Sequence, residues 1–233
     1  GATLPVLIFP FFGLGAWAAF RGRKVSAVGL YCLVQVLFLL VLFSSPRSPK
    51  YDGVRLFLTV FPWIAGLSGI GMAWIQSWWK GRQIMFTLAF SAIIFLLARG
   101  AVVTHPHEFS YYNSLVGGIA GAKKHGFELS YWWDVANPEF CENLNRILPP
   151  NATVRVHPLC SDNFQYYQSL GYIRKDISFV SEPARFLVLM ARQGTFDPWV
   201  WDVYNRKQPV YSIDFDGVPL IMLYDLTINR GEV

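Results

Sequence analysis

Four long, nearly uncharged apolar runs fill the first hundred residues of the chain, at 4–20, 25–43, 56–74 and 84–103. At about 1.5 Å of rise per residue, a helix of about 19 residues spans roughly 28 Å, close to the ~30 Å hydrocarbon core of a bilayer. Helices of this length in a soluble bundle would carry polar stripes, and these runs have almost none. The pattern therefore predicts about four transmembrane helices within residues 1–104.

Two features of these runs refine the prediction. The last run reaches residue 103 only if the charged end of Arg99 snorkels to the head groups. The third run is rich in small residues, which let helix backbones approach closely; these are Gly66, Ser68, Gly69 and Gly71.

The pattern changes after Val103 to mixed polar and apolar residues with frequent turn signals. Asn137, Pro138 and Glu139 mark a helix start, with an N-cap, a proline at the first position and an acid near the positive end of the helix dipole. Asp216-Gly217 between two apolar alternations predicts a β-hairpin. Helices are expected at 137–148, 162–170 and 197–205, and strands at 153–157, 177–180, 185–190, 210–215 and 218–224. This alternation predicts a small α/β domain over residues 105–233.

Composition divides the chain in the same place. Of all residues, 53% are hydrophobic and only 15% are charged, against about 25% charged in ordinary soluble domains. Residues 1–104 hold nine basic residues and one acidic residue, a net charge of +8, whereas the remainder holds eleven basic and fourteen acidic residues, a net charge of −3. The basic residues cluster beside apolar runs, which suits phospholipid head groups. Membrane lipids are therefore the expected partners, and nucleic acid is not.

The basic clusters also predict an orientation. The turns at 21–24 and 80–82 share one side of the membrane and hold five Lys and Arg residues, whereas the intervening loop at 44–55 holds three. By the positive-inside rule the two turns are cytoplasmic. The loop and the α/β domain are then extracytoplasmic, which in a bacterial inner membrane means periplasmic.

Three polar stretches would lie near the head groups on that extracytoplasmic side. They suit contacts with a lipid phosphate or a substrate, because Lys and Arg form charge-assisted hydrogen bonds with phosphate oxygens. The alternative is an aromatic belt that anchors the domain, with ordinary interfacial charges. The candidate binding residues are Lys50, Asp52, Arg55, His105, His107, Glu108, Tyr111, Tyr112, Asn113 and Asp134.

Neither a metal nor a cofactor is predicted. His105, His107 and Glu108 have the side chains of metal ligands, but Pro106 interrupts any shared helical face and no fourth ligand is evident. The glycines at 117, 118 and 121 lack the spacing and the Lys-Ser/Thr of a phosphate loop. We expect these glycines to let the segment pack against the bilayer or against neighbouring helices.

The cysteines leave one question open. Cys141 and Cys160 both fall in the extracytoplasmic domain, whereas Cys32 falls in a membrane run. An oxidising compartment permits a disulfide between Cys141 and Cys160, and both the bridged and the unbridged state fit the sequence.

The three polar stretches also carry a resemblance to a known family. The 50–55 loop that leads into a span with Pro62, the 105–113 segment with its double glycine, and the 131–134 segment resemble the late membrane region of bacterial glycosyltransferases similar to dolichyl-phosphate-mannose–protein mannosyltransferases. These enzymes belong to the GT-C superfamily. The resemblance covers residues 45–140 well and the final α/β domain loosely. It implies a multi-spanning enzyme that moves a sugar from a polyprenyl-phosphate carrier to an acceptor at the extracytoplasmic face.

One part of the family pattern is missing. The resemblance implies a catalytic Asp in the first external loop, shortly after the first span, but no acidic residue precedes Asp52. The chain therefore offers no general base for glycosyl transfer, and no catalytic residue is assigned. The resemblance leaves Asp52 a supporting role, with Lys50 and Arg55 as contacts of the carrier phosphate.

The sequence supports three interpretations. The first is the C-terminal part of such a glycosyltransferase, because the chain begins with Gly1 and enters an apolar run almost at once. The second is a non-catalytic structural or accessory subunit of a larger membrane complex. The third, less favoured, is a lipid- or glycan-binding module without turnover. Besides lipids, the expected partners are a polyprenyl-phosphate sugar or other membrane subunits, and the sequence does not choose between the first two interpretations.

Overall fold

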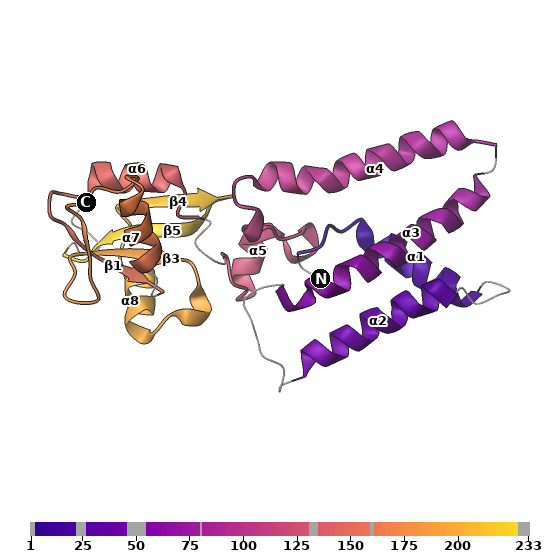
Figure 1. Ribbon diagram of the computed structural model, residues 1–233, viewed down its shortest axis with the longest axis horizontal. Coiled ribbons are helices and arrows are strands. Elements are labelled where there is room, and N and C mark those ends of the chain that lie inside the picture. Colours follow the sequence, from indigo (N-terminus) through magenta and orange to yellow (C-terminus); the bar gives the residue numbers. More distant parts are fainter. Residues whose placement is uncertain are drawn as a thin grey trace. The chain divides into compact units, whose positions relative to one another are not determined.

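The computed structural model describes residues 3–21, 27–45, 55–79, 81–130, 135–158 and 161–227 (Figure 1). The chain divides into two compact units. We call the first the helical unit, which comprises Gly1–His105 and Tyr111–Leu115, and the second the sheet unit, which comprises Pro106–Ser110 and Val116–Val233.

Apolar helices build the helical unit. Its elements are α1 (Ile8–Arg21), α2 (Ala27–Ser44), the 3-10 helix η1 (Arg55–Val60), α3 (Phe61–Trp78) and α4 (Gln83–Thr104). Among the residues that the structure describes, three helices are long and apolar enough to cross a bilayer, namely α2, α3 with the end of η1, and α4. The predicted first span is shorter than expected, because α1 starts only after Pro5 and has 14 residues, about 21 Å in length. The prediction of about four spans thus becomes three, with one shorter apolar helix.

Close backbone contact joins α1 to α3. A Cβ atom added at Gly15 would lie 1.8 Å from the carbonyl oxygen of Leu67, and one added at Gly71 would lie 2.3 Å from that of Phe11. Helices approach this closely only where a residue has no side chain. The predicted role of the small residues is therefore confirmed at Gly71, whereas a Cβ added at Gly69 would meet no atom within 4 Å.

The rest of the helical unit has a small core and extensive apolar surface. The core joins α2 to η1 and α3 through the buried side chains of Cys32, Val36, Val60 and Leu67. Much of the outer surface of α2 and α4 is apolar, as at Val41 and Phe95, which are 73% and 72% exposed. Such faces suit contact with lipid, whose hydrocarbon is as apolar as the side chains themselves.

A five-stranded mixed sheet with the strand order β2-β1-β3-β5-β4 forms the core of the sheet unit. Its strands are β1 (Thr153–His157), β2 (Ser178–Phe179), β3 (Phe186–Met190), β4 (Tyr211–Phe215) and β5 (Val218–Asp225). β1 pairs in parallel with β2 and β3, whereas β5 pairs antiparallel with β3 and β4. The helices are α5 (Gly118–Lys124), α6 (Pro138–Ile147), α7 (Ser161–Ser169) and α8 (Pro198–Arg206), with 3-10 turns η2 (Glu108–Ser110) and η4 (Gln193–Thr195); η3 (Ser114–Val116) lies where the two units meet in the sequence. The predicted small α/β domain is confirmed.

Local signals set several of these boundaries as predicted. The Asn137 side-chain oxygen caps α6 by accepting a hydrogen bond from the Phe140 amide at 3.0 Å. Asp197 caps α8 in the same way, through the Val200 amide at 2.8 Å. Asp216-Gly217 joins β4 to β5 with φ angles of 50° and 73°, the left-handed conformations that a tight hairpin turn requires.

Helices cover both faces of the sheet, so its central strands β3 and β5 are almost wholly buried (Figure 1). Because side chains alternate along a strand, Val154 and Val156 of β1 point to one face, and Arg155 and His157 to the other. Aromatic contacts place α6 and α7 on the face of the two valines. The face of Arg155 and His157 is covered by η4 and the start of α8.

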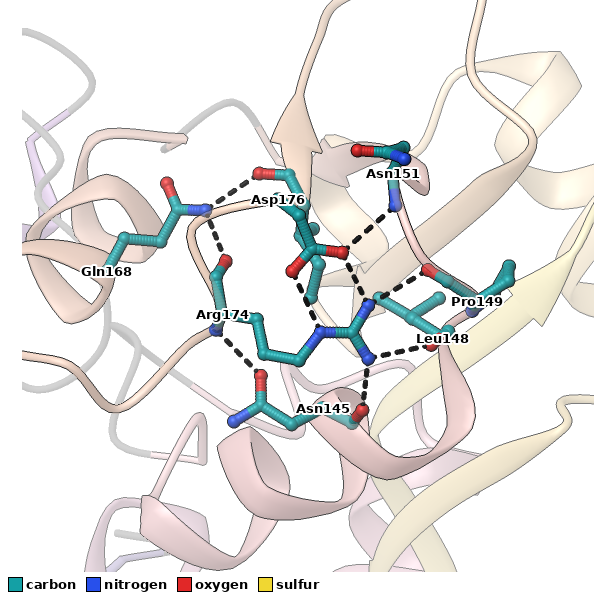
Figure 2. A network of polar contacts seen from close by, with 8 residues as sticks. Asn145, Leu148, Pro149, Asn151, Gln168, Arg174 and Asp176 are labelled. Atoms are coloured by element: carbon teal, nitrogen blue, oxygen red, sulfur yellow. Dashed lines mark hydrogen bonds and ion pairs between the residues drawn. The ribbon is translucent and has the colours of Figure 1, made fainter.

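A polar network centred on Arg174 ties the end of α6 to the segment before β2 (Figure 2). The guanidinium donates hydrogen bonds to the carbonyl oxygens of Asn145 at 2.6 Å, Leu148 at 3.0 Å and Pro149 at 3.0 Å. It also forms a two-pronged ion pair with Asp176, at 2.7 and 3.0 Å. The last carbonyl groups of a helix have no hydrogen-bond donor within the helix, and at the end of α6 the Arg174 guanidinium is that donor. Its role is structural.

Candidate functional site

A groove lies between α3 and α4 within the helical unit. Its volume is about 780 Å³, and it extends along α3 from Phe61 to Gln76. These residues are 15 positions apart, which corresponds to about 22 Å of helix. The groove therefore follows most of the length of a membrane span. Leu4 and Ile8 border it from the N-terminal segment, and Phe90, Ile93 and Leu97 from α4.

The lining of the groove is almost entirely hydrocarbon. None of the described residues that line the groove is charged. The Ser68 hydroxyl is already satisfied, because it donates a hydrogen bond to the Ile64 carbonyl oxygen at 2.8 Å. The other polar side chains, Gln76 and Thr87, lie in the last turns of α3 and the first turns of α4. Such a surface suits an apolar chain and offers little to an ion.

Two residues of the polar 105–113 segment contact elements at the end of the groove away from Gln76, where Leu4 and Leu97 lie. The Asn113 amide donates a hydrogen bond to the Leu4 carbonyl oxygen at 2.7 Å, and its oxygen accepts one from the Leu115 amide at 3.1 Å. Tyr111 packs against α4 at Gly100, where an added Cβ would lie 3.2 Å from the tyrosine ring. Asn113 and Tyr111 thus fold the segment after α4 back against the groove-lining elements.

We expect Asn113→Leu to destabilise the helical unit by about 1–3 kcal/mol, because Leu4 and Leu115 would each lose a hydrogen-bond partner at a site that is only 2% exposed. Thermal unfolding of the full chain in nanodiscs measures the change. The matched control is Ser114→Ala, at the neighbouring exposed position, which should have little effect. Equal stability of the two variants would contradict the structural role of Asn113.

The other predicted residues of this segment divide between the units. His105 caps the C-terminus of α4 and is exposed, and Tyr112 is buried at 7% exposure; both belong to the helical unit. His107 and Glu108 belong to the sheet unit, where the His107 ring lies 5.9 Å from that of Phe215 and Glu108 starts η2. Among the residues that the structure describes, no group of three His, Cys, Asp or Glu side chains could hold a metal ion.

Four of the predicted residues, Lys50, Asp52, Asp134 and Cys160, lie outside the described ranges. The backbone of Arg55 begins η1. Cys141 on α6 is buried, and burial raises the pKa of its thiol to about 11. The disulfide between Cys141 and Cys160 stays a prediction.

The glycines after Asn113 have a local role in the structure, and their predicted role in packing against the bilayer stays a prediction. Gly117 and Gly118 adopt φ angles of 81° and 64°, which side chains disfavour. A Cβ added at Gly121 would lie 1.7 Å from the carbonyl oxygen of Val116. The tight start of α5 therefore explains these glycines.

A second hollow, in the sheet unit, is not among the sites predicted from the sequence. Arg155, Glu182 and Trp199 line it. The available signal was the alternation in β1, where Arg155 and His157 interrupt apolar residues and must share one face. His157 on that face is partly buried, which lowers its pKa, and its Nε2 atom lies 3.1 Å from the Thr195 carbonyl oxygen.

Comparison with protein-family models, with curated proteins and with solved structures finds no match to this chain. A functional assignment therefore depends on the geometry of the groove and of the hollow.

Proposed function

We propose that this chain is the C-terminal membrane and extracytoplasmic part of a polyprenyl-phosphate-sugar-dependent glycosyltransferase-like protein of the GT-C type, in a bacterial inner membrane. In this proposal the helical unit holds the hydrocarbon chain of the lipid carrier, and the sheet unit lies on the periplasmic side. The observation that carries the proposal is the long uncharged groove between α3 and α4.

The shape of the groove supports a lipid chain as its occupant. The helices that border it are of bilayer length and apolar, so the medium around it would be hydrocarbon rather than water. A polyprenyl chain is long and methyl-branched, and it would lie along the ~22 Å of helix between Phe61 and Gln76. Among the described residues that line the groove, apart from Ser68, a compact polar substrate would find hydrogen-bonding side chains only near the Gln76 end.

The polar segment supports a position for the carrier's head group. Asn113 and Tyr111 lie against the elements at the Leu4 end of the groove, which is also where α4 ends and the 105–113 segment begins. A phosphate at that end would lie near Asn113 and Tyr111, which are among the residues predicted to bind a lipid phosphate or a substrate. We propose Lys50 and Arg55 as its cationic contacts, since both flank the start of η1 and α3.

Blocking the groove tests this function. Ala65 lies in the groove, and Ala65→Trp should reduce the binding of a polyprenyl monophosphate about tenfold or more, because the indole would fill the space of the chain. Native mass spectrometry of the full chain in lipid measures the bound fraction. The matched control is Ala92→Trp, on an exposed position of α4 that does not line the groove. Equal binding by both variants would contradict the proposal.

The phosphate contacts have a separate measurement. K50A/R55A should weaken the binding of polyprenyl monophosphate but leave that of the uncharged polyprenol unchanged, because only the former needs charge-assisted hydrogen bonds. Equal losses for the two lipids would rule out a phosphate contact.

A non-catalytic accessory subunit is the second candidate. It is favoured by the single acidic residue among the first 107 positions, Asp52, because glycosyl transfer needs a general base. The two candidates differ in turnover. With a polyprenyl-phosphate sugar as donor, an enzyme fragment would transfer the sugar when expressed with the N-terminal spans of such a glycosyltransferase, whereas a subunit would co-purify with stoichiometric membrane partners.

A further inference from the structure

The hollow in the sheet unit has a volume of about 490 Å³, within the usual range for small-molecule sites. Arg155 of β1 lines it. The connection between β2 and β3 contributes Glu182, Pro183 and Ala184, and the first turn of α8 contributes Trp199. Leu226, just after β5, also lines it, so four segments that are distant in sequence meet around one opening on the Arg155 face of the sheet.

The charged groups of the hollow are held in place. The Arg155 guanidinium forms an ion pair with Glu182 at 2.5 Å and lies 4.5 Å from the centre of the Trp199 ring. Within the described part of the chain, the ion pair is the only hydrogen bond that either charged side chain makes. The Arg155 side chain is 21% exposed and that of Glu182 is 73% exposed. Free N–H donors of the arginine and a free acceptor oxygen of the glutamate therefore stand side by side at the opening.

Trp199 differs from its neighbour on the same helix. Trp201 packs its ring against Phe196 and Tyr204, at centroid distances of 5.0 and 5.9 Å, which explains its presence by core packing. Trp199 has no aromatic partner among the described residues, is 40% exposed, and borders the hollow. A large, partly exposed indole that borders an opening beside Arg155 is a surface available to a ligand.

We propose that this hollow binds a neutral saccharide. A sugar ring has C–H groups on its faces and hydroxyls around its edge. Arg155 lies over one face of the Trp199 indole, so the C–H groups would stack on its other, electron-rich face. Each hydroxyl both donates and accepts hydrogen bonds, as the adjacent guanidinium and carboxylate require. An anionic ligand fits less well, because it would compete with Glu182 for Arg155. This inference rests on the sheet unit alone and is independent of the function proposed for the groove.

Saturation-transfer NMR on the full chain tests the inference, with neutral trisaccharides of glucose, mannose and galactose as probes. The chain is kept in phosphatidylcholine nanodiscs, because detergents with sugar head groups would occupy the site. We expect transfer to the ring C–H protons of at least one trisaccharide at millimolar concentration. W199A should weaken that binding about tenfold or more, as for other aromatic anchors.

Three variants separate binding from folding. W201A is the matched control, because Trp201 lies on the same helix and is 36% exposed but does not line the hollow; it should leave binding unchanged. R155M should weaken binding strongly, and E182Q, which keeps an acceptor oxygen, should weaken it less. Absence of transfer to all three sugars, equal losses in W199A and W201A, or a preference for glucose 6-phosphate over glucose would each overturn the inference.

Discussion

Replacing Gly71 by alanine is expected to separate α1 from α3 and to destabilise the helical unit by about 3 kcal/mol or more. The new methyl group would lie 2.3 Å from the Phe11 carbonyl oxygen, which is a backbone atom of the facing helix. Overpacking costs about 1–3 kcal/mol where side chains can adjust, and a helical backbone adjusts less. The readout is the temperature at which the Cys32 thiol, 6% exposed in the core beside Leu67, becomes reactive to a maleimide.

Gly69→Ala is the control for this prediction. It makes the same chemical change two positions away, where the added methyl group would meet no atom within 4 Å. Because alanine favours a helix over glycine by about 1 kcal/mol, this variant should be as stable as the natural chain or slightly more so. Similar labelling temperatures for Gly71→Ala and Gly69→Ala would contradict the prediction, because they would show that α1 and α3 admit a methyl group at Gly71 without loss of stability.

Elements with local signals could be predicted from the sequence. Asn137 and Asp197 cap their helices through amides three residues ahead, and Asp216-Gly217 closes its hairpin with two adjacent residues. In each case the interaction that decides the structure lies within four positions of the residue that signals it. The long helices of the helical unit could be predicted equally well, because the length of an apolar run and its lack of charge are properties of a single segment.

Features that depend on distant contacts could not be predicted. The insertion of β5 between β3 and β4 depends on pairing across the whole sheet. The groove needs α3 and α4 to be placed relative to each other, and periodicity says nothing of that placement. Asn113 is a candidate binding residue because of its polarity beside the membrane, but its described bonds are to Leu4 and Leu115. The sequence locates a polar segment without distinguishing its structural residues from any that bind a ligand.

Arg174→Ala is expected to have the largest effect in the sheet unit. Alanine would leave the carbonyl oxygens of Asn145, Leu148 and Pro149 without their donor, at the end of α6 and in the turn that links it to β1 (Figure 2). The ion pair itself contributes less, since the Arg174 side chain is 32% exposed and water screens the charges. We expect the unfolding temperature of the unit to fall by on the order of 10 °C, as measured by hydrogen exchange of peptides from β1.

Arg174→Lys separates charge from geometry. Lysine keeps the positive charge but lacks the planar fork that reaches several acceptors at once. If the carbonyl contacts dominate, Arg174→Lys should lose most of the stability that Arg174→Ala loses. A lysine variant as stable as the natural chain would mean that charge alone stabilises this turn.

The same network predicts how the sheet unit responds to acid. Hydrogen bonds from Arg174 and from the Asn151 amide hold the pKa of Asp176 well below its ordinary value of 3.8. A carboxylate with a depressed pKa stabilises the fold fully above its unfolded-state pKa, near 3.9, and loses that contribution as the pH falls through the folded-state value. Between about pH 5 and about pH 3, the natural chain should therefore lose stability more steeply than Asp176→Asn, whose side chain does not titrate. Parallel stability curves for the two proteins would mean that the Asp176 carboxylate is not coupled to folding, and that the carbonyl contacts of Arg174 alone hold the turn.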